Sequence, residues 1–188
     1  MNHRDDLLEG AKKCLVEKGY AHTTARDIAA ASGAHLASIG YHYGSKDALM
    51  NAAVIAATSE WGDTLAEALE SVEAPDPRTR LAALLERMRA RMRLPGDRDL
   101  LLASVQAYAE AQFSPDLRTA LGEAYQEAHR EFAALLDPGA QDTPQGRALG
   151  AAAYALFSGI ILQELIDPDG LPGTEALVAA LYRLTGAG

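Results

Sequence analysis

The chain has 188 residues, of which 48% are hydrophobic and 6% are aromatic, and its formal net charge is −9. A chain of this length can bury a substantial core and suits one or two small domains. Alanine and leucine dominate and alternating β-branched runs are absent, so the composition favours helices and gives no strand signal. Cys14 is the only cysteine, which excludes an intrachain disulfide framework and favours a reducing compartment.

Neither a secretory signal nor a membrane span is expected. Asp5 and Asp6 interrupt the N-terminus before any apolar segment begins. We find no segment that approaches the about 20 apolar residues needed by a membrane-spanning helix. These features predict a cytoplasmic protein.

The negative charge is unevenly distributed along the chain. Residues 1–50 hold six Lys/Arg and six Asp/Glu, whereas the remaining residues hold 11 Lys/Arg and 20 Asp/Glu. All four lysines lie at or before Lys46. This asymmetry suits a DNA-facing N-terminal part on an acidic body, although any acidic soluble protein can show it.

The first two expected helices are marked by capping residues. The first begins near residues 5–6 and ends at Gly19, a residue suited to terminate a helix. Thr23 or Thr24 caps the second helix, and Asp27 is the capping-box partner of Thr24. A pair of short helices in this region is therefore predicted.

The later helices are separated by proline and glycine signals. A third helix follows a turn at Gly33, and Ser45 caps a fourth that continues to about Glu70. Five further helices are expected to begin at about residues 77, 97, 115, 145 and 174. The prediction is an all-α chain of about nine helices, divided into residues 1–50 and residues 51–188.

The spacing of three residues predicts a helix-turn-helix. Ala29 is small where the two helices cross, Gly33 permits the turn, and Ile39 is an apolar anchor, at steps of four and six. Ile28 and Ile39 are expected to hold the helix pair against the first helix. The segment thus has the requirements of a DNA-reading motif.

The orientation of Ile39 indicates which side chains face outward. Residues two positions away on a helix are rotated by about 200°. Ala37 and Tyr41 therefore point most directly outward, flanked by Ser38. These three residues are candidates for facing a DNA groove.

Residues 8–50 resemble the DNA-binding domain of the TetR family of bacterial transcriptional regulators. The match includes Thr24, Ile28, Ala29 and Gly33, and then the run Ile-Gly-Tyr-His-Tyr-Gly-Ser-Lys-Asp-Ala-Leu over residues 39–49. The all-helical remainder is similar in pattern to the family's ligand-binding and dimerisation domain. The resemblance implies a dimeric repressor that binds a palindromic DNA operator and is released by a small-molecule effector.

The resemblance also implies individual DNA contacts. Tyr43 stands where the family usually has a buried phenylalanine, which implies a packing role. Gly40 replaces a common tyrosine, and Leu36 replaces a polar or basic residue, so apolar contacts and DNA shape gain importance. The implied contacts to phosphates come from Thr24, Tyr41, His42 and Lys46, and those to base edges or thymine methyls from Leu36, Ala37 and Ser38.

The C-terminal part offers candidate dimer and ligand surfaces, although the same residues suit an ordinary helical core. Small residues that permit close helix approach alternate with apolar residues over 148–165. The expected dimer interface comprises Leu156, Phe157, Gly159, Ile160, Leu177 and Leu181. A mostly apolar small-molecule site is expected among Trp61, Met88, Met92, Tyr108, Gln112, Phe113, Tyr125, His129 and Phe132.

Four alternating arginines occur in the fifth expected helix. Arg87 pairs with Arg91, and Arg89 with Arg93, at steps of four on different faces. They cannot form one binding surface and are expected to be solvated beside acidic neighbours, and contact with an anionic ligand is the alternative.

The sequence gives no support for an enzyme and leaves one other class of function open. The chain has no P-loop or glycine-rich dinucleotide motif, and its five histidines and one cysteine are scattered. We therefore expect no catalytic residues, no metal site and no cofactor. The alternative to a DNA-binding regulator is a helical ligand-binding or interaction module without DNA function.

Overall fold

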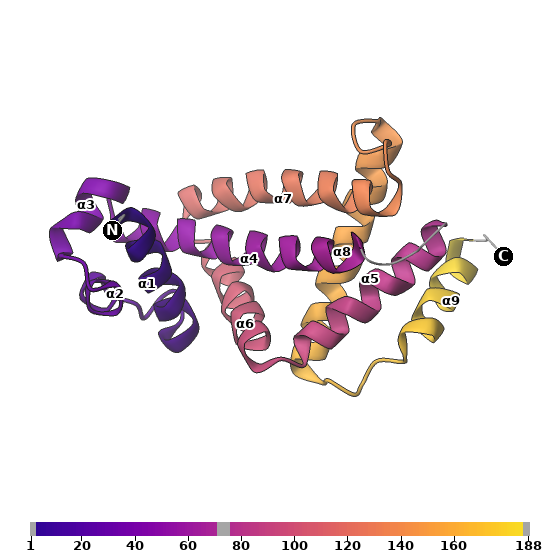
Figure 1. Cartoon of the computed structure of the whole chain (residues 1–188), viewed down its shortest axis with the longest axis horizontal. Helices are drawn as coiled ribbons and strands as arrows, with labels where there is room; N and C mark the ends of the chain where they lie inside the picture. The colour runs from indigo at the N-terminus through magenta and orange to yellow at the C-terminus, as the bar shows by residue number, and fades with distance from the viewer. Residues whose placement is uncertain (1–2, 71–75, 186–188) are drawn as a thin grey trace. The chain divides into compact units, whose positions relative to one another are not determined.

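The computed structural model describes residues 3–70 and 76–185, except for the side chains of residues 61, 64–66, 68–70 and 185. Its described residues form nine helices and no strand, which confirms the predicted all-α class (Figure 1). The helices are α1 (His3–Lys18), α2 (Ala25–Ser32), α3 (Leu36–Tyr43), α4 (Lys46–Glu70), α5 (Pro77–Met92), α6 (Pro95–Glu110), α7 (Pro115–Leu136), α8 (Pro144–Ile166) and α9 (Thr174–Thr185).

The chain divides into two compact units. Unit 1 comprises Met1–Trp61 and Asp99–Ala124, and unit 2 comprises Gly62–Arg98 and Tyr125–Gly188. Helices α4, α6 and α7 each contribute residues to both units. The division into residues 1–50 and 51–188 stays a prediction.

Most helix ends follow the expected local signals. Gly19 has a φ of +80° directly after α1, a conformation that glycine adopts without a steric penalty. The start of α6 is two residues earlier than expected, at Pro95. Proline suits the first helical position because the amide hydrogen that it lacks would have no intrahelical partner there.

In unit 1, α1 packs closely against α2. Leu7, Leu15 and Ile28 are completely buried. A Cβ added to Gly10 would lie 2.8 Å from the Cβ of Ser32, so the two helices approach at a position that requires glycine. The burial of Ile28 agrees with the sequence prediction, whereas the close approach at Gly10 has no signal in the sequence.

In unit 2, α8 has one buried face and one accessible face. The residues buried inside the chain recur at steps of four and three: Gly146, Gly150, Ala153, Phe157, Ile160 and Glu164. Phe157 and Ile160 were expected to contact a second copy, and this part of the prediction is wrong because both belong to the core of their own chain. Outside this buried stripe, α8 carries Leu149, Ala152, Leu156, Gly159 and Ile166, which are exposed or half-buried.

Helix α8 also corrects the expectation about long apolar segments. Over its 23 residues it is long and apolar enough to cross a membrane by length and composition alone. One third of its most apolar stretch is buried inside the chain. A core helix of a soluble protein passes the same test, so α8 is weak evidence for a membrane span.

The crossing of α7 and α8 is tight and aromatic. A Cβ at Gly150 would lie 1.8 Å from the backbone oxygen of His129, so only glycine fits there. Beside this crossing, the rings of Tyr125, His129 and Phe132 on α7 surround Tyr154 on α8, with ring centroids 5.4–5.7 Å away. These contacts fix the register of the two helices.

One of the four alternating arginines is not solvated as expected. Arg89 is buried, and its Nε lies 2.5 Å from Oε1 of the buried Glu164. Arg89 also donates to the backbone oxygen of Pro172, at 2.9 Å. A buried charge requires an opposite charge and hydrogen-bond partners. Since Arg89 lies on α5 and Glu164 on α8, their pairing joins these two helices.

Candidate nucleic-acid interface

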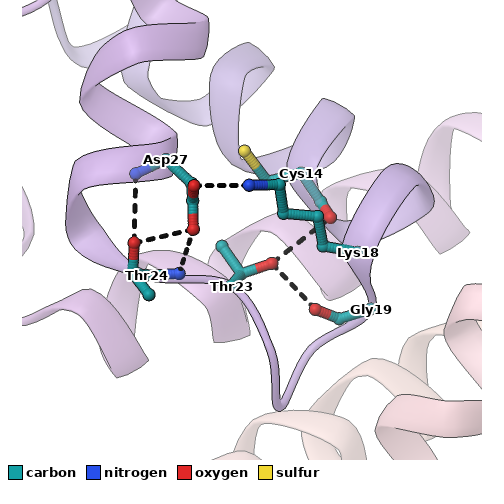
Figure 2. A network of polar contacts seen from close by, with 6 residues as sticks. All are labelled: Cys14, Lys18, Gly19, Thr23, Thr24 and Asp27. Atoms are coloured by element: carbon teal, nitrogen blue, oxygen red, sulfur yellow. Dashed lines mark hydrogen bonds and ion pairs between the residues drawn. The ribbon is translucent and has the colours of Figure 1, made fainter.

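A polar network fixes the N-terminus of α2 (Figure 2). The hydroxyl of Thr24 accepts from the Asp27 amide at 3.2 Å, and the Asp27 carboxylate accepts from the Thr24 amide at 2.9 Å. The predicted capping box is therefore present. The Thr24 hydroxyl also donates to Asp27, at 2.6 Å, so its hydrogen is already engaged within the chain.

The same network ties α1 to α2. The ammonium group of Lys18 at the end of α1 lies 2.5 Å from Asp27. Its hydrogen bond, together with those from Thr24, holds the pKa of Asp27 well below the usual range. The buried hydroxyl of Thr23 donates to the backbone oxygens of Cys14 and Gly19, at 3.2 and 2.8 Å. Hence α2 starts at a defined angle to α1 (Figure 2).

The turn between α2 and α3 follows the expected pattern. Gly33 is left-handed, with a φ of +69°. The amide of Ala34 donates to the Ser32 hydroxyl at 3.2 Å, and the amide of Ser38 donates to the His35 backbone oxygen at 2.9 Å. His35 is exposed in an extended conformation before α3, and its side chain makes no capping hydrogen bond.

The surface of α3 outside the buried Ile39 is accessible and mostly apolar. Leu36 is 48% exposed and Tyr41 is 85% exposed. Ala37 is exposed, whereas Ser38 is half-buried. This arrangement matches the predicted outward orientation of Ala37 and Tyr41 and leaves few hydrogen-bonding side chains at the N-terminal end of α3.

The C-terminal end of α3 is held against α1 by Tyr43. Its hydroxyl donates to the backbone oxygen of Arg4 at 2.9 Å, and the Arg4 guanidinium lies 5.5 Å from the ring centroid. Burial raises the pKa of Tyr43. The implied packing role of Tyr43 thus agrees with its contacts, while His42 lies edge-on to Tyr41 with ring centroids 4.9 Å apart.

The first turn of α4 positions Lys46. Ser45 accepts from the Ala48 amide at 3.0 Å, as its expected capping role requires. The Lys46 ammonium lies 2.8 Å from Asp47 and 5.8 Å from the ring centroid of Tyr20. Sequence reasoning missed Tyr20, which is buried; the only signal was an aromatic residue directly after the helix-ending Gly19.

Tyr20 connects the loop after α1 to α4. Its hydroxyl donates to the Asn51 side chain at 2.6 Å in a buried contact. Burial raises the pKa of Tyr20 to about 12, so the phenol stays a hydrogen-bond donor at physiological pH. This contact fixes the start of α4 relative to the helix-turn-helix.

The residues expected to bind a ligand have different environments. Met88 and Met92 are buried in unit 2, and Tyr125, His129 and Phe132 belong to the aromatic group around Tyr154. Tyr108 is half-buried in unit 1, and the side chain of Trp61 lies outside the described residues. Gln112 and Phe113 lie exposed in the turn after α6, Phe113 by 77%, so they line no interior site of their unit.

Two family models match the chain. Residues 7–53 match the model described as bacterial regulatory proteins, tetR family. Residues 76–187 match the tetracyclin repressor-like C-terminal domain. The first covers α2, α3 and the start of α4, and the second covers helices α5–α9.

Individual relatives are distant. The HTH-type transcriptional repressor AcnR of Corynebacterium efficiens is 33% identical over 67 residues, and the match spans 36% of each protein. The HTH-type transcriptional regulator BetI 2 of Chromohalobacter salexigens is 25% identical over 92% of this chain and 82% of its own length. The crystal structure of the multidrug binding protein EbrR complexed with imidazole has 27% identity and a TM-score of 0.70, over 98% of this chain and 95% of that chain.

The fold and the exposed helix-turn-helix define a DNA-binding transcriptional regulator. The chain belongs to the TetR family of bacterial regulatory proteins, since the C-terminal model alone spans more than half of its residues.

Proposed function

We propose that the protein is a cytoplasmic, homodimeric repressor that binds a palindromic operator and is released by a small-molecule effector. The observation that carries the DNA-binding part is the accessible face of α3, with Leu36 and Tyr41 exposed while Ile39 is buried against the rest of the domain. A recognition helix presents its N-terminal residues to base edges in the major groove. Leu36 and Ala37 occupy that end of α3.

The proposed DNA contacts combine apolar readout with phosphate binding. Leu36, Ala37 and Ser38 approach base edges and thymine methyl groups, and Tyr41, His42 and Lys46 contact phosphates. The hydroxyl hydrogen of Thr24 is engaged with Asp27, so Thr24 supports phosphate binding by fixing the N-terminus of α2. Its hydroxyl donates to a phosphate only after its hydrogen bond to Asp27 is broken.

The proposed dimer surface is the accessible stripe of α8 together with α9. Ile166 is 78% exposed, and Leu156 and Gly159 are half-buried. A helix that is apolar on all sides is normally buried on all sides. One face of α8 is buried in the core of its own chain, so its accessible apolar residues require another surface to cover them. On α9, Leu177 and Leu181 are half-buried. A second copy of the chain, required to read two half-sites, is the proposed cover.

The proposed effector site lies in unit 2, beside the aromatic group of α7 and α8. Met88, Met92, Tyr125, His129 and Phe132 supply apolar surface and a few polar groups, as small-molecule sites require. The related EbrR was solved with imidazole, which supports a small organic effector as the class of ligand.

Selection from a random duplex library with the full-length protein, followed by fluorescence anisotropy on the selected duplex, tests DNA binding. We expect sequence-specific binding that weakens steeply with salt, because phosphate neutralisation releases counterions. The double variant Tyr41→Ala with Lys46→Ala removes two phosphate contacts and reduces both the affinity and the salt dependence. Unchanged affinity contradicts the assigned contacts, and failure to select any sequence favours a module without DNA function.

Light scattering tests the dimer. A Cβ at Gly159 meets no atom within 4 Å, so Gly159→Glu leaves the isolated chain intact but places a charge on the proposed surface. We expect a dimer for the wild type and a monomer for this variant. The control Gly122→Glu on α7 also meets no atom within 4 Å and should remain dimeric. A wild-type monomer, or a dimeric Gly159→Glu, contradicts the proposed interface.

A further inference from the structure

The lysines of the helix-turn-helix region are partly neutralised by carboxylates of their own neighbours. Each of the four lysines of the chain lies within 4.0 Å of a carboxylate. The pairs are Lys12 with Glu9 and Glu60, Lys13 with Glu17, Lys18 with Asp27, and Lys46 with Asp47. A phosphate that approaches such a lysine also meets the paired carboxylate, so the net attraction is smaller than that of an isolated ammonium group.

Histidines are concentrated in the same region. Four of the five histidines lie in the first 42 residues, and only His129 lies elsewhere. His35 precedes the first residue of α3 and His42 is the seventh residue of that helix. The two imidazoles therefore lie at opposite ends of the proposed recognition helix.

The local structure leaves the His35 imidazole available to a ligand. The backbone oxygen of His35 accepts from the Ser38 amide, and the left-handed Gly33 holds the preceding turn. The side chain is exposed and makes no capping bond. Its neighbours Leu36 and Ala37 carry no hydrogen-bonding side chain, so His35 and Ser38 are the polar side chains at the N-terminal end of α3.

The charged neighbours of α3 come from the helices packed against it and from the start of α4. Helices α1 and α2 both pack on α3. Asp27 on α2 is bound to Lys18 and to Thr24. Other charged residues on these elements include Arg4 on α1, whose guanidinium lies over Tyr43, Arg26 on α2, and the Lys46–Asp47 pair at the start of α4.

We propose that His35 contacts operator DNA as an imidazolium, and that His35 and His42 together make operator binding dependent on proton uptake. This proposal rests on the proposed DNA-binding function. Histidine is the side chain that ordinarily changes charge between pH 5 and 8. A phosphate beside an imidazole stabilises its protonated form, so formation of the complex takes up protons. The operator affinity therefore rises as the pH falls, and acidification favours the bound state.

Anisotropy titrations of the full-length protein on the selected duplex, at constant ionic strength between about pH 6 and 8.5, test the proposal. Each linked histidine contributes up to about a tenfold change in affinity per pH unit, over the pH interval between its pKa in the free protein and its higher pKa in the complex. We expect His35→Gln to bind more weakly at low pH and to reduce this slope. His22→Gln, at an exposed histidine to which no DNA or effector contact is assigned, is the matched control and should retain the wild-type slope.

A second variant separates charge from packing. His35→Arg carries a permanent charge, so it should bind tightly at both ends of the pH range and show a reduced slope. A merely structural role of His35 would not be rescued by arginine and would not alter the pH dependence. Wild-type binding that is independent of pH, or a His35→Gln variant with the wild-type slope, overturns the proposal while leaving DNA binding intact. Absence of sequence-specific binding at every pH contradicts the proposed function itself.

Discussion

The α1–α2 contact and the α7–α8 contact both depend on a glycine, but the surrounding polar groups differ. At Gly10 the crossing is accompanied by short-range capping bonds among Thr24, Asp27 and Lys18. At Gly150 the crossing is accompanied by an aromatic group and, elsewhere in the same unit, by a buried ion pair. Hydrogen bonds and an exposed ion pair therefore accompany the α1–α2 contact, whereas aromatic packing and a buried ion pair support unit 2. The two regions should respond differently to substitution.

The largest effect is expected at the buried ion pair of unit 2. Arg89→Met leaves Glu164 buried without its cation, which should lower the free energy of unfolding by about 3–5 kcal/mol. Urea denaturation measures this loss. The double variant Arg89→Met with Glu164→Leu should recover most of it, because it buries no charge. A single variant within about 1 kcal/mol of the wild type would contradict the burial of this pair.

The next effect is expected at the helix crossing. Gly150→Ala places a methyl group against the His129 backbone oxygen and should cost about 3 kcal/mol of unfolding free energy, because backbone atoms cannot rotate away. Gly122→Ala, on an open part of α7, should stabilise the protein by up to about 1 kcal/mol through helix propensity. Equal melting temperatures for the two alanine variants would show that α7 and α8 do not cross this closely.

In the DNA-reading domain, a smaller loss is expected from the α2 cap. Thr24→Ala removes the hydroxyl that accepts from the Asp27 amide and should cost about 1 kcal/mol. Thr24→Ser retains the hydroxyl and should behave like the wild type. Thermal unfolding followed by circular dichroism compares the two. A Ser variant as unstable as the Ala variant would assign the loss to the methyl group and not to the cap.

The smallest effect is expected from the exposed Lys18–Asp27 pair, and it should depend on pH. The pKa of Asp27 is lowered in the folded protein. A lowered carboxyl pKa stabilises the fold above the ordinary aspartate range of about 4, and this contribution is lost as the pH falls below it. The wild type should therefore be more stable than Asp27→Asn at neutral pH, with a difference that shrinks in acid. A difference that is constant with pH would exclude the ionised carboxylate as its source.

The sequence predicted the local features well because they depend on residues close together in the chain. Thr24 with Asp27, Ser45 with Ala48, and Gly33 at its turn each lie within one helical turn of the atoms that they bind or redirect. These caps and this turn could therefore be predicted without knowledge of the tertiary structure. The outward orientation of Tyr41 followed in the same way from one buried anchor and the helical period.

The sequence could not predict features that require a partner from elsewhere. Arg89 and Glu164 are 75 positions apart, and the alternating arginines gave no sign of which one would be buried. Helix α8 is apolar on nearly every side, so its period did not distinguish the core residues Phe157 and Ile160 from the accessible face. The contact of Gly10 with α2 could not be predicted either, since a glycine inside a helix does not by itself indicate which neighbour it approaches.

Gly40 allows the proposed entry of α3 into a DNA groove to be tested without disturbing the fold. This residue is exposed, and a Cβ added to it meets no atom within 4 Å. Gly40→Glu should leave thermal unfolding nearly unchanged but reduce affinity for the selected duplex by about a hundredfold, because a carboxylate would oppose phosphates and base acceptors. Gly122→Glu, with the same change of charge on α7, should bind like the wild type. A folded Gly40→Glu protein that keeps the wild-type affinity would contradict the account.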